Sequence, residues 1–206
     1  MVETAQRPLV GFAADYPAGL LTQQHSHPRT QLLYAVSGVM RIDTPTIAYT
    51  VPPALALVLP ANALHTVRMD GQVAMRALFL REDAATRASR TGVIAVSPLL
   101  RELILVACAE PVDWIGGRGH HLTELAVDGI ARATAVPLGL PMPRDPSLCR
   151  VVAVLVQRSD DWRGLDELAM MAGASPRTLA RMFRAETGLS FRQWRQQARM
   201  TRRCGR

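Results

Sequence analysis

Three histidines near the N-terminus have the types and spacing of metal ligands. His25 and His27 are two residues apart, so on an extended strand both imidazoles project from the same face. His65 follows 38 residues later, after a proline-containing turn. Neutral imidazoles can hold a divalent metal such as Zn, Ni, Cu or Fe. The alternative is that these histidines hydrogen-bond inside a pocket that has lost its metal.

The arginines indicate a second kind of chemistry, the recognition of a polyanion. The chain has no lysine, so all 24 of its basic residues are arginine. Residues 144–206 contain 13 arginines and six acidic residues, whereas residues 1–143 contain 11 of each. The formal net charge of +7 therefore lies in the last third of the chain. This asymmetry predicts a polyanionic partner for that segment alone.

Residues 165–188 are predicted to form two short helices joined by a tight turn. Apolar residues recur at helical spacing from Leu165 to Ala172, and Gly173 supplies the backbone freedom at which helices commonly end. Ser175 and Pro176 suit the N-cap and the first position of a second helix. This layout is typical of a helix-turn-helix that places its second helix in the major groove. The alternative is a helical hairpin with a solvated arginine face.

Two further helices are expected around this pair. One covers residues 148–156 and is expected to pack against the two-helix unit. The other follows a capping-box pattern formed by Ser190 and Gln193. It is predicted to bury Phe191 and Trp194, and to expose a row of arginines at positions 192, 195, 199, 202 and 203.

The first part of the chain has the pattern of a small barrel. Between Gln31 and Leu80, short apolar runs alternate with glycine and proline breaks, and no helix is predicted between them. The runs QLLYAVSG, VMRID, ALALVLP, HTVRM and VAMRALFL each suit a strand. Several short strands in succession favour an antiparallel sandwich or jelly roll.

Residues 86–136 are predicted to form a helical spacer. Ser97 and Pro98 begin one amphipathic helix, and a second follows the glycine-rich turn at 116–119. These helices either pack back on the barrel or pair with the same helices of a second chain in a homodimer. Residues 137–145 are rich in proline and are expected to form a semi-rigid linker. The sequence thus predicts an α+β chain: a barrel at residues 1–85, a spacer at 86–136, a linker at 137–145 and an all-α module at 146–206.

The histidine motifs resemble those of the cupin superfamily. Gly19, His25-Ser26-His27, Gln31 and Gly38 are similar to the first cupin motif, and Pro60, Asn62 and His65 to the second. Asn62 stands where the family usually has glycine, but asparagine tolerates the left-handed backbone of such a turn. The acidic ligand of the family is replaced by Gln31, and its late asparagine is missing near Met69. The implied metal ligands, His25, His27, Gln31 and His65, therefore carry less negative charge than the usual set.

The segment SPRTLARMFRAETGLSFRQWRQQARM closely resembles the first DNA-binding subdomain of AraC-type transcriptional regulators. A cupin-like sensor, a helical spacer and this module, in that order, are the arrangement of the members with an N-terminal effector domain. The resemblance implies double-stranded DNA and a small-molecule effector as partners, a homodimer, and no catalytic residues. By position, Arg177, Ala180 and Arg181 match base-facing sites, and Thr178 and Arg184 match sites nearer the phosphates.

One departure from the family concerns the end of the chain. Family members follow this subdomain with a second helix-turn-helix, whereas this sequence ends in TRRCGR. We therefore expect a truncated regulator that binds DNA weakly and with little sequence preference. The three cysteines lack metal or disulfide spacing, and no apolar run has the length of a signal peptide or membrane span, which predicts a cytoplasmic protein without a membrane partner.

Two other functions compete with a ligand-responsive regulator. A metal-dependent cupin enzyme, such as an oxygenase or isomerase, would use the histidines. The metal pattern lacks its carboxylate, however, no acid or base stands beside it, and an enzyme does not explain the basic C-terminal segment. An interaction protein that dimerises with a full-length relative and inactivates it is the third hypothesis.

Overall fold

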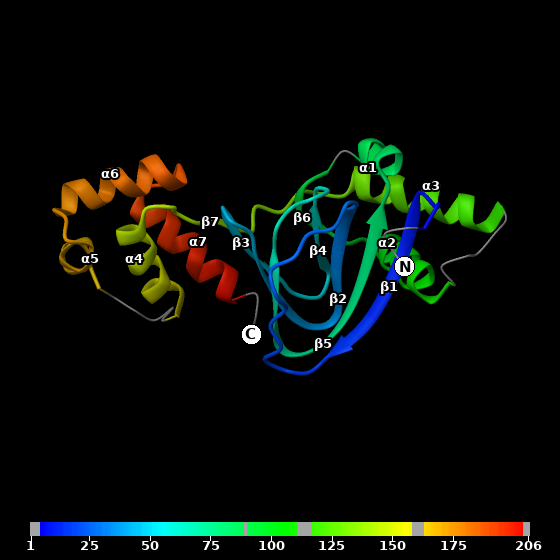
Figure 1. The fold of residues 1–206 in the computed structure, drawn as a ribbon, viewed down its shortest axis with the longest axis horizontal. Coiled ribbons are helices and arrows are strands. Elements are labelled where there is room, and N and C mark those ends of the chain that lie inside the picture. Colours follow the sequence, from blue (N-terminus) through cyan, green and yellow to red (C-terminus); the bar gives the residue numbers. More distant parts are fainter. Residues whose placement is uncertain (1–4, 89, 111–116, 158–162, 204–206) are drawn as a thin grey trace. The chain divides into compact units, whose positions relative to one another are not determined.

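The computed structural model in Figure 1 describes residues 5–88, 90–110, 117–157 and 163–203. The predicted α+β fold class is confirmed, since a mixed set of strands and helices is present. The chain divides into two compact units. The first comprises Met1–Ile42 and Val51–Pro137, and the second comprises Asp43–Thr50 and Leu138–Arg206.

The strands of the first unit pair in antiparallel fashion. β1 (Leu9–Tyr16) lies along the second half of β5 (Thr66–Leu80), with Leu9 opposite Leu80 and Tyr16 opposite Val73. β5 in turn neighbours β2 (Thr30–Asp43), which also pairs with β4 (Leu55–Leu59). β4 pairs with β6 (Gly92–Ala95), so the sheet extends beyond the predicted barrel end at residue 85.

Two strands are longer than the sequence pattern predicts. QLLYAVSG and VMRID form the single strand β2, and HTVRM and VAMRALFL, from Thr66 onward, form the single strand β5. Gly38 and Gly71, expected to end strands, instead adopt φ values of 78° and 82° within them. A Cβ at Gly38 would lie 2.2 Å from the backbone oxygen of Gln72, so glycine is required where β2 and β5 approach closely.

Three helices complete the first unit: α1 (Glu82–Ala88), α2 (Pro98–Ala109) and α3 (Gly117–Arg132). Ser97 caps α2 by accepting a hydrogen bond from the backbone N–H of Leu100 at 3.2 Å. The inner faces of α2 and α3 share one core with the strands, including Ile104, Ala126, Ile130, Leu78 and Leu80. The spacer helices thus pack back on the sheet, which was one of the two predicted arrangements.

The second unit contains α4 (Pro146–Gln157), α5 (Leu165–Ala172), α6 (Pro176–Thr187) and α7 (Phe191–Arg203). Leu148, Val152, Leu168, Phe183 and Trp194 are buried in its core. The left-handed Gly173 ends α5 at φ 66°, and Ser175 caps α6, as the sequence pattern predicts.

The second unit also contains a short pair of strands. β3 (Ile47–Val51) lies antiparallel to β7 (Gly139–Pro141), with Ala48 opposite Leu140. The predicted linker at 137–145 therefore contains a strand. It is ordered because Leu140 joins the core, and because the backbone oxygens of Pro141 and Gly139 accept hydrogen bonds from the side chains of Trp194 and Gln197 at 2.7 and 2.6 Å.

Candidate metal centre and nucleic-acid interface

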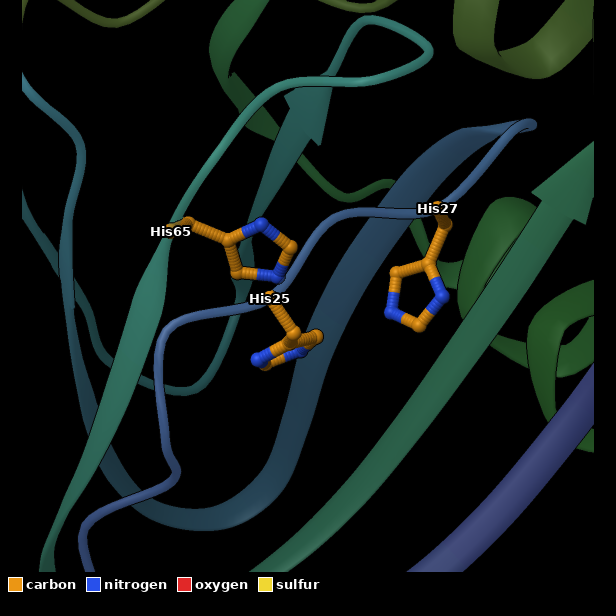
Figure 2. A group of neighbouring side chains, drawn as sticks. All are labelled: His25, His27 and His65. Carbon is orange, nitrogen blue, oxygen red and sulfur yellow. The ribbon is translucent and has the colours of Figure 1, made fainter.

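The three predicted histidines meet in the first unit, as Figure 2 shows. His25 and His65 form an isolated antiparallel bridge, with N–H to O distances of 3.0 and 2.9 Å in the two directions. His27 lies outside regular strand structure, so a bridged loop, and not the predicted strand, directs the first pair. The ring centroids are 4.3–5.8 Å apart, and the potential ligand atoms all lie within 4.8 Å of one another.

Backbone geometry joins the two histidine motifs. Asn62 adopts the left-handed conformation at φ 61°, as its place in the motif predicts. Its backbone N–H donates to the backbone oxygen of His27 at 2.6 Å. The turn that precedes His65 is thereby fixed to the loop that carries His27.

Hydrogen bonds define which imidazole nitrogens can bind a metal. Nδ1 of His65 lies 2.9 Å from the backbone oxygen of Ala63, and Nδ1 of His25 lies 2.8 Å from that of Gln23. Because a carbonyl oxygen only accepts, each Nδ1 carries a proton, which in the neutral ring leaves the lone pair on Nε2. Metal-binding histidines are commonly oriented in this way. The pKa of His65 is lowered, mainly by burial and to a smaller extent by the nearby His25 and His27. The hydrogen bond to the Ala63 backbone oxygen acts in the opposite direction and raises this pKa. The neutral, ligating form of His65 is therefore favoured.

Two buried acceptors at this place have no hydrogen-bond partner among the described residues. They are Nε2 of His65 and Oε1 of Gln31, whose side chains belong to residues only 1% and 5% exposed. Leaving a buried polar atom unsatisfied costs about 1–3 kcal/mol. The three imidazoles fit a divalent ion, which would satisfy the lone pair of His65, and Gln31 lines the same cavity as His25 and His27, so its carboxamide oxygen is the candidate fourth donor.

A cavity of ≈ 330 Å³ opens beside the histidines, and His25, His27 and Gln31 are part of its wall. Tyr16 and Thr22 contribute hydroxyl groups, and the rest of the described lining is apolar: Phe12, Leu33, Val67, Met69, Met75 and Phe79. His27 packs edge-on against Phe79, with ring centroids 5.0 Å apart. These wall residues could not be recognised from the sequence, because their alternation in strands resembles that of any core.

The predicted DNA-contacting residues lie on or beside the outer face of α6. Leu179 and Phe183 are buried, whereas Arg177, Arg181 and Arg184 are exposed. Thr178 and Ala180 are only half-buried, so they border this face. The backbone N–H of Thr178 donates to the Ser175 hydroxyl at 3.2 Å, and the two hydroxyls lie 2.9 Å apart. Thr178 therefore also takes part in the helix cap.

α7 adds further exposed arginines to the second unit. The predicted capping box is present, with the N–H of Gln193 donating to the Ser190 hydroxyl and the N–H of Ser190 to the Gln193 side chain. Arg192 and Arg199 are exposed. Arg195, predicted to be exposed, is half-buried, because it donates to the backbone oxygen of Arg163 at 2.6 Å and lies over the Phe191 ring. The side chains at positions 202 and 203 lie outside the described part of the structure.

The arginines of the two units differ in their pairing. In the first unit, seven arginines pair with carboxylates, for example Arg41 with Asp70 at 2.7 Å and Arg132 with Asp128 at 2.8 Å. The exposed Arg68 is an exception, since its side chain makes no hydrogen bond or ion pair in the part of the chain that the structure describes. Within the described residues, no hydrogen bond or ion pair is made by the exposed side chains of α6 and α7, namely Arg177, Arg181, Arg184, Arg192 and Arg199. Their guanidinium groups are free to meet an external anion.

The chain combines an antiparallel sheet that carries a histidine cluster with a helix-turn-helix unit, which is the arrangement expected from its resemblance to AraC-type regulators with a cupin-like domain. The chain is similar to the HTH-type transcriptional regulator NimR of Escherichia coli (strain K12). The two are 29% identical over 188 residues, which cover 88% of this chain and 67% of NimR. The name of this relative supports the helix-turn-helix part of the resemblance inferred from the motifs. No protein-family model matches the chain.

Solved structures of AraC-like proteins are also similar to the chain. A ToxT variant from Vibrio cholerae in its apo form gives a TM-score of 0.45 at 7% identity, covering 96% of this chain and 82% of ToxT. The AraC-like transcriptional activator CuxR gives a TM-score of 0.41 at 12% identity, covering 95% of this chain and 76% of CuxR. Among the described helices, none combines the length and apolar character that crossing a membrane requires.

Proposed function

We propose that this protein is a cytoplasmic transcription regulator of the AraC type that binds duplex DNA through α6 and senses an effector in its cupin-like cavity. The observation that carries the proposal is the row of exposed arginines without carboxylate partners on a helix-turn-helix, in a chain whose other unit pairs most of its arginines with carboxylates. The similarity to NimR, a regulator by name, supports it.

DNA recognition would use α6 as the helix in the major groove. Arg177 and Arg181 are four residues apart and therefore lie on one side of the helix. Each guanidinium can donate two hydrogen bonds to O6 and N7 of a guanine. Ala180 offers an apolar contact, for example to a thymine methyl group, while Thr178 and Arg184 lie nearer the phosphates.

Sensing would use the histidine cluster and the cavity next to it. His25, His27, His65 and Gln31 would hold a divalent ion such as Zn, Ni, Cu or Fe, as their orphaned acceptor atoms support. The ion would supply a Lewis-acidic position for an effector atom. The chain's own residues orient the donors through the carbonyl oxygens of Gln23 and Ala63, and the apolar wall excludes water.

Self-association would use the outer faces of α2 and α3. Leu99 on α2 and Leu125 on α3 are 62% and 50% exposed although the opposite faces of both helices are buried in the core. Exposed leucines on neighbouring helices suit a homodimer, which would place two DNA-binding units on one operator.

The second candidate function is a metal-dependent cupin enzyme, which the histidine cluster favours. Among the described residues that line the cavity, however, none is a carboxylate, lysine or cysteine that would act as an acid or base. The enzyme also gives no role to the arginines of α6. Turnover by the metal-loaded protein without DNA affinity would favour it.

The test is DNA binding by the whole chain, measured by fluorescence anisotropy with a labelled mixed-sequence duplex at increasing salt. We expect the logarithm of the affinity to fall with the logarithm of salt, with a slope of about −0.9 for each phosphate contacted. Reversing two charges on α6, Arg177→Glu with Arg181→Glu, should abolish binding. The matched control reverses two charges on α3, Arg118→Glu with Arg132→Glu, and should retain it. Equal losses in the two variants would contradict an interface on α6.

A further inference from the structure

The cavity of the first unit is lined by side chains that can bind a metal but carry no formal charge when they do so. Its donors are imidazoles and one carboxamide, all of them neutral when they ligate. No described residue of the lining carries a carboxylate, and none carries a cationic side chain other than the imidazoles. Asp15, which neighbours the lining residue Tyr16 along β1, pairs instead with Arg76 at 3.1 Å.

A divalent ion bound here would keep its double positive charge in a largely apolar cavity that is partly open to solvent. An uncompensated charge in a medium of low dielectric is strongly unfavourable. A carboxylate at position 31 would remove part of that charge, whereas Gln31 supplies only a lone pair. Compensation must therefore come from a molecule that enters the cavity.

The cavity also limits the shape of that molecule. Its volume of ≈ 330 Å³ lies at the lower end of about 300–1,000 Å³ found for ligand pockets. Phe12, Met69, Met75 and Phe79 are among the apolar residues of the wall, which favours a small hydrocarbon body. With no described arginine or lysine in the wall, an anionic group has no cationic partner except the metal.

We propose that Gln31 makes this cavity a receptor for a small organic monoanion, with an apolar body against the phenylalanines and methionines and an anionic head, such as a carboxylate, at the metal. The inference rests on the proposed metal binding by His25, His27 and His65. It goes further by assigning the effector a charge and a size, and by making Gln31 the residue that selects the charge.

The experiment uses the full chain loaded with Zn²⁺, and with Co²⁺ as a spectroscopic substitute. Metal content is measured first. Isovalerate and isovaleramide, which have the same carbon skeleton and differ in charge, are then titrated in by calorimetry. We expect isovalerate to bind the metal-loaded chain at least about tenfold more tightly than the amide, because only the anion neutralises the ion. It should also change the Co²⁺ absorption spectrum, and this preference should be absent from the metal-free chain.

Gln31→Glu is the matched variant, since it keeps the shape and adds the missing charge. It should retain the metal and weaken isovalerate binding by about a hundredfold, because like charges then share the site. Equal binding of acid and amide to the metal-loaded wild type would overturn the inference and leave metal binding intact. A wild-type chain without bound metal would instead overturn both the metal centre and this inference. The wild-type comparison needs no variant, so a Gln31→Glu protein that fails to fold does not prevent a decision.

Discussion

We predict that the helix-turn-helix unit, when excised from the chain, is stable only if the strand β7 is included. Two peptides test this, residues 146–206 and residues 138–206. Both contain α4 to α7, but only the longer one contains β7 and its contacts with α7. We expect the longer peptide to be considerably more stable towards unfolding.

The contacts of β7 set the size of the expected difference. Leu140 is 4% exposed, and losing its burial costs about 1.5–3 kcal/mol. The side chains of Trp194 and Gln197 lose acceptors that lie 2.7 and 2.6 Å away, at about 1 kcal/mol for each hydrogen bond. The total of about 3.5–5 kcal/mol is comparable with the whole stability of many units of this size.

The assay is urea unfolding of both peptides, followed by far-ultraviolet circular dichroism and tryptophan fluorescence. Residues 138–206 should show a cooperative transition, and residues 146–206 should be largely unfolded before urea is added. Leu140→Ala in the longer peptide is the control and should cause about half of the loss, since it leaves both backbone acceptors in place. Equal transition midpoints for the two peptides would refute the assigned role of β7.

Three other predictions concern the two sites. Arg184→Ala should weaken binding to a mixed-sequence duplex and reduce the steepness of its salt dependence by about 0.9, whereas Arg132→Ala on α3 should leave both unchanged in anisotropy titrations. His27→Ala should reduce the bound metal from roughly one equivalent to almost none by elemental analysis, while the exposed His120 can be replaced by alanine without loss. Ser175→Ala should destabilise the second unit by about 1 kcal/mol in urea unfolding, because it removes the N-cap of α6.

Local features of the fold could be predicted from the sequence. Ser97 and Ser175 cap α2 and α6, and Ser190 with Gln193 forms the capping box of α7. Such caps depend on residues only three positions apart, so their chemistry is visible in one short stretch. Gly173 ended its helix for the same reason, since a left-handed residue is required at that single position.

Features set by tertiary contacts could not be predicted in this way. Gly38 and Gly71 usually indicate the end of a strand, but here the strands continue through them. The proline-rich stretch around Pro141 lacks strand character by itself. It becomes a strand because Leu140 finds a place in the core and Trp194 finds an acceptor. Neither partner is visible from the local sequence.

The residues of the candidate sites also differ in whether the local sequence reveals them. The histidines could be found because clustered imidazoles are rare and their spacing is informative. Phe12 and Phe79 could not, because a residue that lines a cavity and one that fills a core give the same alternation along a strand. Arg195 was assigned to the exposed face because helical periodicity does not reveal a hydrogen bond to Arg163 or a contact with the Phe191 ring.

The two sites differ in how much their polar groups destabilise the fold when no partner is bound. In the first unit, Oε1 of Gln31 and Nε2 of His65 are buried acceptors, and leaving them unsatisfied lowers the stability of the fold. In the second unit, Arg177 and Arg181 are exposed donors that water already solvates, so leaving them unpaired costs almost nothing. A ligand of the cavity should therefore stabilise the fold as it binds. DNA, in contrast, gains most of its binding free energy from released counterions, which explains why salt should weaken the second interaction far more than the first.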